Sequence, residues 1–417
     1  MNYYFLEALK ASLQSEKVEW NKENRSEIQL ADLQALFQLA EKHKVLPMIC
    51  EAVCDTPAVG GMEPEILAAL KKRAVQQVIL QSMKTNEFLA LNRYLRKEGL
   101  HPLVVKGIVC REQYPNADYR QSGDEDILIS ENEFEQCHRA MLSYGMLPVN
   151  QEGDASVAHE ISYRKPGTPL YIEMHKFLFS PESQAYGDWN RFFEQVHECP
   201  EVLYVQDTAV LTLNYTDHLL YLICHAFKHF IHSGFGIRQV CDIVLFANTY
   251  GSRIDWQRVL AGCREIRAEK FAAALFLIGE KYLVFDRAFA SYPEEWARIA
   301  VDETLLLEDL LAGGIYGDSD MSRKHSSGMT LHAVTAQKKG GRVGGSILRT
   351  LFPPAKYLEN RYPCLKKHPC LLPFVWIDRV LKYGKETRGN EQNRAAESIK
   401  VGNRRISLLK SYDIIEK

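Results

Sequence analysis

Apolar residues recur three and four positions apart along much of the first hundred residues, which is the spacing of an amphipathic helix. The pattern is clearest in ADLQALFQLAEKHKVLPMICEAV at residues 31–53 and in PEILAALKKRAVQQVILQSMKTNEFLALNRYLRKEG at residues 64–99. The same period returns between residues 217 and 283. We therefore predict two helical regions separated by a segment of different character.

The segment between them carries short apolar or alternating runs, which are typical of strands. HPLVVKG at residues 101–107 and EDILIS at residues 125–130 predict two strands, and ENEFEQCHRAMLSYG at residues 131–145 predicts a helix. VAHEISYRKPGTPLYIEMHKFLF at residues 157–179 has two alternating runs around a Pro-Gly-Thr turn, so we expect a β-hairpin there. This order predicts an α+β fold in which a small mixed sheet is covered by helices.

A further change of composition begins at residue 313. Residues 313–347 are rich in Gly, Ser and Lys and have little periodicity, which is typical of a long loop or flexible connection. The predicted organisation is a helical N-terminal region at 1–100, a mixed-sheet core at 101–200, a helical domain at 201–312, the connection at 313–347 and a helical C-terminal region at 348–417.

Composition limits the partners and the compartment. Hydrophobic residues make up 46% of the chain and charged residues 25%, as in an ordinary globular protein. The formal net charge of −2 gives no general attraction to nucleic acid or anionic lipid. The N-terminus lacks a signal-peptide pattern, no apolar run approaches the roughly 18 residues of a membrane span, and the ten cysteines show no zinc spacing. We expect a cytoplasmic protein with reduced thiols and no membrane partner, and nucleic acid is not favoured as a partner.

Three acidic residues stand at the start of one predicted strand, in YRQSGDEDILIS. Like charges this close together raise the free energy of the folded protein unless a cation lies among them. On a strand, Asp124 and Asp126 point to one face and Glu125 points to the other. The pair on one face could bind divalent cations, whereas the alternative is a solvated acidic turn.

The predicted hairpin supplies further polar side chains. In LYIEMHKF, Glu173 and His175 lie on the same strand face. If this strand pairs with the EDILIS strand, Glu173 joins Asp124 and Asp126 as a third carboxylate. Three carboxylates suit two Mg²⁺ ions, and one of them could take the proton of an attacking hydroxyl. The alternative is a hairpin with a polar, solvated face.

The turn in VVKGIVC is a candidate phosphate site. Gly107 lies between a strand and a helix, where phosphate can approach backbone amides at the helix N-terminus. Lys106 adds a compact positive charge that suits phosphate oxygens. Arg120 precedes Asp124 by four residues and could pair with the acidic residues or bind a phosphate. Taken singly, each of these features is also common for structural reasons.

The chain resembles a bacterial family of uncharacterised nucleotidyltransferases within the polymerase-β-like superfamily, which also contains the minimal and aminoglycoside nucleotidyltransferases. The resemblance rests on Lys106-Gly107, Tyr114-Pro115, Arg120, the Asp-x-Asp strand and IEMHKFLF, in this order. It continues through HLLYLICHAFKH, GIRQVCDIVLF and IDWQRVL. One departure is that the superfamily usually has Gly-Ser where this chain has Lys-Gly, with a shorter gap to the acidic pair.

The resemblance implies a reaction and a set of roles. Asp124 and Asp126 would hold Mg²⁺, two ions in all, and Glu173 would be the third ligand or the general base. The reaction would transfer a nucleoside monophosphate from an NTP to a hydroxyl acceptor and release pyrophosphate. The implied nucleotide contacts are Lys106, Gly107, Arg120 and His175.

Two other functions stay open. A protein with this fold could bind and sense a nucleotide without turnover, because a fold does not guarantee chemistry. It could also modify a protein hydroxyl as one partner of a toxin–antitoxin type of module. The acceptor could be a sugar, an antibiotic, a protein side chain or an RNA end.

Three further patterns have simpler interpretations. His225 and His229 are four residues apart and could bind zinc, but HEXXH is absent, so we expect them to line the cleft or satisfy buried polar groups. Arg238 and Asp242, also four apart, predict a helical ion pair. KKGGRVGG at residues 338–345 predicts a flexible basic loop, with ordering over a bound nucleotide as the alternative.

Overall fold

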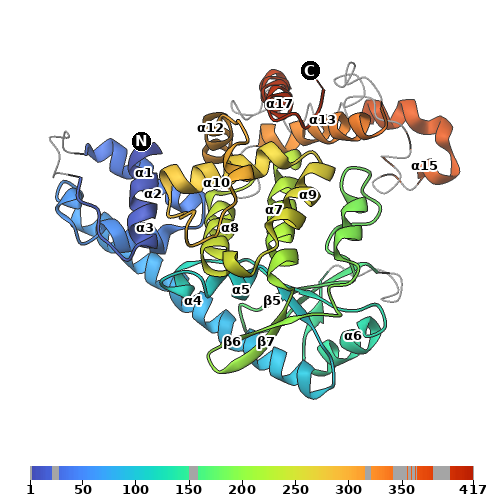
Figure 1. Cartoon of the computed structure of the whole chain (residues 1–417), viewed down its shortest axis with the longest axis horizontal. Coiled ribbons are helices and arrows are strands. Elements are labelled where there is room, and N and C mark those ends of the chain that lie inside the picture. The colour runs from blue at the N-terminus through green and yellow to red at the C-terminus, as the bar shows by residue number, and fades with distance from the viewer. Residues whose placement is uncertain are drawn as a thin grey trace. The chain divides into compact units, whose positions relative to one another are not determined.

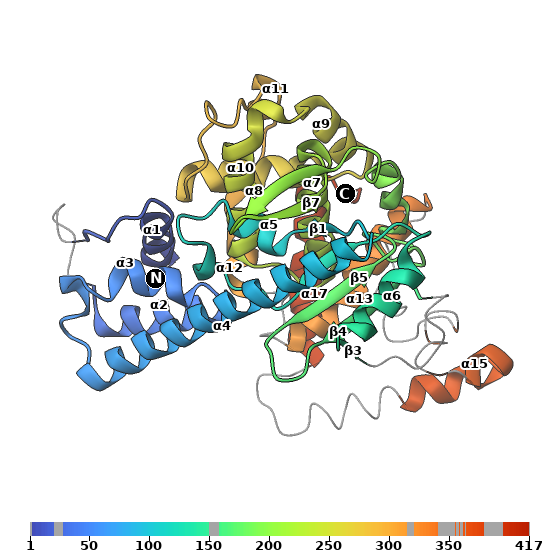
Figure 2. The ribbon, with the colours of Figure 1, turned by 90° about the horizontal axis from the view of Figure 1, so that it is seen from below.

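Figures 1 and 2 show a computed structural model of the chain. The chain folds as two compact units. The first unit comprises Met1–Ala226 and Gly236–Glu303, and the second comprises Phe227–Phe235 and Thr304–Lys417. The structure describes residues 2–20, 28–149, 158–314, 321–340, 364–378 and 395–416, together with Ala355, Leu358 and Tyr362.

The N-terminal part of the first unit is helical, as the apolar spacing predicts. Pro47 and Pro64 lie in the first turns of two of these helices, where the missing N–H of proline costs no hydrogen bond. Gly99 follows the last helix with φ of +78°, a left-handed conformation typical of a helix end. The helices are α1 (Asn2–Leu13), α2 (Leu30–Lys42), α3 (Leu46–Val53) and α4 (Pro64–Lys97), with a 3₁₀ turn at Pro57–Val59.

A five-stranded sheet follows, in the order β1-β2-β5-β4-β3. The β2–β5 pair is parallel and the other neighbouring pairs are antiparallel. The β4–β5 pair is the predicted hairpin, and the small mixed sheet with its helices confirms the predicted α+β fold. The strands are β1 (Leu103–Val105), β2 (Glu125–Leu128), β3 (Leu147–Pro148), β4 (Glu160–Arg164) and β5 (Tyr171–His175).

Short helices connect these strands. α5 (Gly107–Arg111) begins directly after β1, and a 3₁₀ turn at Ala117–Tyr119 leads towards β2. α6 (Phe134–Ser143) connects β2 to β3. Every residue of β1 and β2 is buried, so any polar side chain on these strands needs a partner.

A separate two-stranded ribbon, which was not predicted from the sequence, consists of β6 (Glu201–Val205) and β7 (Thr208–Thr212). Its two-residue turn, Gln206–Asp207, has positive φ at both positions, which matches the twist of a tight hairpin. The ribbon contacts the five-stranded sheet, because the Thr212 hydroxyl donates a hydrogen bond of 2.6 Å to the Val104 carbonyl.

The helices predicted after the sheet are also present. Trp256 and Trp296 pack edge to face and are buried in this part of the first unit. α7 spans the boundary, since its residues up to Ala226 belong to the first unit. The helices are α7 (Tyr215–His232), α8 (Ile237–Tyr250), α9 (Trp256–Glu265), α10 (Glu269–Tyr282) and α11 (Glu294–Ala297), with 3₁₀ turns at Gly187–Phe193 and Gly251–Arg253.

The second unit corrects one prediction. Residues 321–338 were expected to be part of a loop, but they form helix α13. Met329 and Ala333 are buried on this helix, which packs against α17, so packing compensates for a weak sequence period. Residues 341–347, including most of the basic glycine-rich stretch, lie outside the described residues. The helices here are α12 (Glu303–Gly313), α13 (Met321–Lys338), α15 (Cys364–Lys367) and α17 (Ala395–Ser411), with a 3₁₀ turn at Pro369–Leu371.

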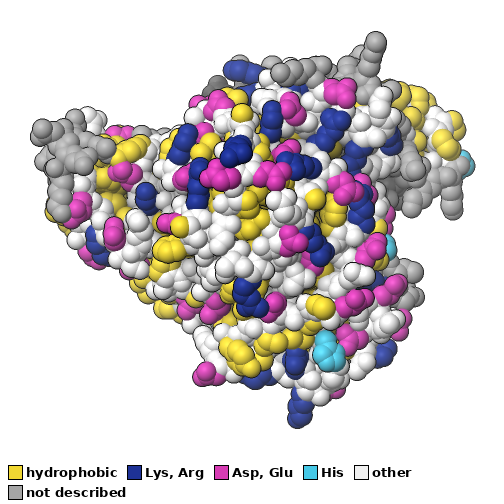
Figure 3. All heavy atoms as spheres, in the orientation of Figure 1, with side chains coloured by type: hydrophobic (Ala, Val, Ile, Leu, Met, Phe, Trp, Pro, Cys, Tyr) yellow, Lys and Arg dark blue, Asp and Glu magenta, His cyan; other side chains and the backbone are white. Residues whose placement is uncertain are grey.

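The surface agrees with the near-neutral composition. On the face shown in Figure 3, acidic and basic side chains are interspersed rather than gathered by sign. Among the described residues, no helix has both the length and the apolar character needed to cross a bilayer.

Candidate active site

The parallel pairing of β2 with β5 brings three side chains of ligand type together. Asp126 lies opposite Glu173 in the strand register, and His175 follows two residues later on the same face of β5. One ligand atom from each of these residues lies within 4.8 Å of the others. Two of the carboxylates expected from the sequence therefore meet, and His175 lies beside them.

Asp126 is almost completely buried, with 4% of its side chain exposed. Lys106 Nζ lies 2.8 Å from Asp126 Oδ2, and His175 Nε2 lies 3.2 Å from Oδ1. Burial alone would raise the pKa of Asp126, but Lys106 and His175 outweigh it and hold the pKa well below its usual range. The Lys106 ammonium is thus the partner of Oδ2, and the His175 ring is the partner of Oδ1. Asp126 is thus ionised and has an oxygen suited to a cation.

Glu173 has a different environment. Its side chain is 27% exposed, and its Oε2 lies 3.7 Å from His175 Nε2. Burial raises the pKa of Glu173 to about 7, and the charges of Asp126 and Asp124 add to the effect. The Glu173 carboxylate is therefore only partly ionised near neutral pH unless a further cation compensates its charge.

Asp124 lies immediately before β2, at the edge of this group. It is half-buried, and its charge contributes to the raised pKa of Glu173. It is not among the three residues whose ligand atoms lie within 4.8 Å of one another. No residue in the described part of the chain forms an ion pair or hydrogen bond with its carboxylate. The structure thus places Asp124 near Glu173 but outside the compact cluster.

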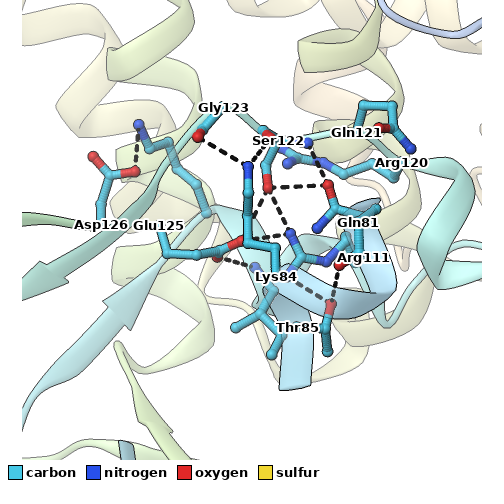
Figure 4. Close-up of polar contacts among 12 residues, drawn as sticks. Gln81, Lys84, Thr85, Arg111, Arg120, Gln121, Ser122, Gly123, Glu125 and Asp126 are labelled. Atoms are coloured by element: carbon cyan, nitrogen blue, oxygen red, sulfur yellow. Dashed lines mark hydrogen bonds and ion pairs between the residues drawn. The ribbon is translucent and has the colours of Figure 1, made fainter. Parts of the chain in front are cut away.

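Glu125 points to the opposite face of β2, as the strand period predicts (Figure 4). Its carboxylate is fully buried and accepts hydrogen bonds from the Ile108 N–H (2.8 Å), the Arg111 guanidinium (2.6 Å) and the Ser122 hydroxyl (2.9 Å). The middle acid of the Asp-Glu-Asp run therefore ties the first turn of α5 to β2.

The Lys106-Gly107 turn is locked in an unusual conformation. Lys106 has φ of 58° and ψ of −136°, a region that costs a non-glycine residue about 1–3 kcal/mol. Gly107 also has positive φ, and a Cβ atom there would lie 1.9 Å from Glu125 Oε2. Only glycine therefore fits at residue 107 while Glu125 keeps its place.

His218 on α7 holds the backbone of this turn. The Thr212 hydroxyl donates its proton to the Val104 carbonyl, so it accepts from His218 Nδ1 at 3.0 Å. His218 Nε2 is then the acceptor for the Lys106 N–H at 3.3 Å. Burial lowers the pKa of His218 to about 3, in agreement with a neutral imidazole.

Comparison with known proteins identifies the family of this chain. A family model described as "Uncharacterised nucleotidyltransferase" matches residues 29–283, more than half of the chain and all of the residues above. The chain belongs to this nucleotidyltransferase family. No curated protein sequence matches it. Among solved structures, it is similar to an antigenic nucleotidyltransferase-like protein from Paracoccidioides brasiliensis, at 13% identity and a TM-score of 0.30, over 50% of this chain and 96% of that one.

Arg120, implied as a nucleotide contact in this nucleotidyltransferase, lies in a buried ion pair. Its guanidinium donates to both oxygens of Asp242, at 3.0 and 2.6 Å. The Tyr114 hydroxyl donates to the same carboxylate at 2.8 Å, and the Arg238 guanidinium donates to the Gln121 carbonyl. Asp242 thus joins α8 to the segment before β2 through a long-range ion pair that the sequence does not predict.

The structure does not place His225 and His229 in a zinc site among the described residues of this nucleotidyltransferase. Lys106 Nζ lies 3.3 Å from His225 Nε2, and the Tyr221 ring packs against the His225 ring. Within the described residues, no group of three possible metal ligands includes His225 or His229. His225 therefore lies beside Lys106, next to the cluster of Asp126, Glu173 and His175.

The cluster fits a divalent cation. Asp126 and Glu173 offer hard carboxylate oxygens that lie, with a ring nitrogen of His175, within 4.8 Å of one another. His175 could be a third ligand, or it could orient Asp126 through the contact between Nε2 and Oδ1. These are the residues that would hold a metal in this nucleotidyltransferase.

The close approach at Gly107 predicts a loss of stability on substitution. Gly107→Ala should lower the free energy of unfolding by about 1–3 kcal/mol, because the new methyl group must displace Glu125. The urea midpoint of unfolding measures this change. Gly61→Ala is the matched control, since no heavy atom lies within 4 Å of its added Cβ. Equal midpoints for the two variants would contradict the interpretation.

The neutral state of His218 predicts a pH dependence. Its folded-state pKa of about 3 lies below the ordinary value of 6.5, so its contribution to stability is complete above pH 6.5 and decreases as the pH falls towards 3. His218→Gln should reduce the slope of the unfolding free energy between pH 6 and 4 by up to about 1.4 kcal/mol per pH unit. His101→Gln, at a side chain that is 61% exposed, is the control. An unchanged slope for His218→Gln would show that His218 is not held neutral.

Proposed function

We propose that this protein is a Mg²⁺-dependent enzyme that transfers a nucleoside monophosphate from an NTP to a hydroxyl acceptor and releases pyrophosphate. We also assign its core to the polymerase-β-like superfamily. The observation that carries the proposal is the β2–β5 register, which sets Asp126 opposite Glu173. Membership in a nucleotidyltransferase family supports the same reaction class.

The carboxylates hold the metal in this proposal, and Glu173 has a second role as the base for the acceptor hydroxyl. Asp126 and Glu173 hold the metal, and Asp124 at the edge of the cluster completes the set for a second ion. When bound, Mg²⁺ would neutralise charge on the triphosphate and orient it. His175 fixes the orientation of Asp126, and Lys106 is the nearest cation that could contact a phosphate oxygen.

The transfer itself is an exchange of two bonds at one phosphorus. The acceptor hydroxyl oxygen forms a bond to the α-phosphorus, and the bond from that phosphorus to the oxygen bridging to the β-phosphate breaks. Pyrophosphate leaves with the electron pair, and a carboxylate takes the hydroxyl proton. Glu173 is the best placed for this role, because it is the most exposed member of the three-residue cluster.

Metal dependence provides the first test. Asp126→Asn should weaken Mn²⁺-dependent binding of a non-hydrolysable NTP analogue by at least about tenfold, because a neutral amide replaces the best cation ligand. Isothermal titration calorimetry with and without Mn²⁺ measures the change. Asp207→Asn is the control, since this exposed acid lies in the β6–β7 turn. Binding that is equally strong in Asp126→Asn, or independent of metal in the wild type, would contradict the proposed site.

Turnover provides the second test and separates an enzyme from a nucleotide sensor. Purified protein should release pyrophosphate from an NTP in the presence of Mg²⁺ and a suitable acceptor, and EDTA should abolish the release. Glu173→Gln should lower the rate by about 10²–10⁴-fold if Glu173 accepts the proton. A coupled pyrophosphate assay over a panel of sugars, antibiotics, proteins and RNA ends measures both effects. Tight metal-dependent NTP binding without turnover across the panel would favour the sensing function.

A further inference from the structure

The ammonium group of Lys106 lies against Asp126 Oδ2, one of the two oxygens through which Asp126 could bind a metal cation. Lys106 Nζ is 2.8 Å from Asp126 Oδ2 and 3.3 Å from His225 Nε2. An ammonium can only donate, so His225 accepts from it through Nε2. A carboxylate oxygen and an imidazole nitrogen are both common metal ligands, yet in this structure they surround a lysine.

The lysine is held in this position from its backbone. Lys106 N donates to His218 Nε2, and the following Gly107 is enclosed by Glu125. The Lys106 side chain is 13% exposed, and the charge of Asp126 compensates that of its ammonium group. A free divalent cation would meet a positive charge beside the oxygen that it needs.

A metal that arrives bound to a nucleotide differs from a free cation, because the nucleotide carries negative charge to the lysine. The triphosphate brings several negative charges, and a flexible lysine is well suited to contact phosphate oxygens as a point charge. The Lys106 ammonium can therefore exchange its contact with Asp126 for a contact with phosphate oxygens when Asp126 binds the metal. The free metal offers no such replacement.

On this basis we infer that Lys106 blocks Asp126 against free divalent cations, so that the metal enters this site as its complex with the NTP. The inference rests on the proposed function and names the form of the substrate that the site accepts. Lys106 then pairs with Asp126 in the nucleotide-free protein and contacts a phosphate once the nucleotide is bound.

The test measures metal binding in the absence of nucleotide. Lys106→Met removes the charge with little change in side-chain size, and we expect its affinity for Mn²⁺ alone, measured by calorimetry or by electron paramagnetic resonance, to rise at least tenfold above that of the wild type. Lys106→Gly removes the same charge and accommodates the positive φ of 58°, so it should fold at least as readily and show the same rise. Lys165→Met, at a lysine paired with Glu87, should leave the Mn²⁺ affinity unchanged.

The second arm adds a non-hydrolysable NTP analogue to each protein. The wild type should then bind Mn²⁺ tightly, whereas the Lys106 variants should bind the analogue at least tenfold more weakly than the wild type. Equal Mn²⁺ affinities of the wild type and both Lys106 variants would overturn the inference. If the Mn²⁺ affinities were equal but Asp126→Asn still abolished Mn²⁺-dependent nucleotide binding, the proposed function would stand and only the inference about Lys106 would fail. A wild type with no Mn²⁺-dependent nucleotide binding would overturn both.

Discussion

The candidate site depends on the register between β2 and β5. These strands are distant in sequence but pair in parallel, with Asp126 opposite Glu173. Because side chains alternate between the faces of a sheet, a slip of one residue would move the acidic face of one strand away from that of the other. The same alternation buries Glu125 beneath α5 while Asp126 joins the cluster on the other face. One backbone constraint therefore places Glu125 among structural hydrogen bonds and Asp126 in the candidate metal site.

Charge compensation explains how a buried strand can begin with three consecutive acids. Glu125 is neutralised by the Arg111 guanidinium and by hydrogen bonds, so it stabilises the turn that leads into α5. Asp126 is neutralised by Lys106. Asp124 stays at the edge, where solvent reduces the cost of its charge. The acidic run is thus neither a solvated turn nor a uniform metal site, since each carboxylate has its own partner or exposure.

Local patterns in the sequence predict the strands and the faces on which Asp126, Glu173 and His175 lie, because both follow from a period of two residues. They do not predict long-range polar partners, which depend on the final packing. Arg120 is implied as a nucleotide contact, yet it pairs with Asp242 on a helix far along the chain. The backbone role of His218 has no local signal either, although its place near His225 does draw attention to that helix. The β6–β7 ribbon is different, since its alternating residues around a short turn carry a signal that the prediction missed.

The central claim is that Asp126 and Glu173 share a metal that carries the nucleotide. A crystal structure with Mn²⁺ and a non-hydrolysable NTP analogue would test it most directly, because anomalous scattering locates manganese independently of the protein. We predict an anomalous peak within bonding distance, about 2.0–2.3 Å, of carboxylate oxygens from both residues, with a phosphate oxygen on the same ion. A bound nucleotide whose metal contacts neither carboxylate would contradict the account.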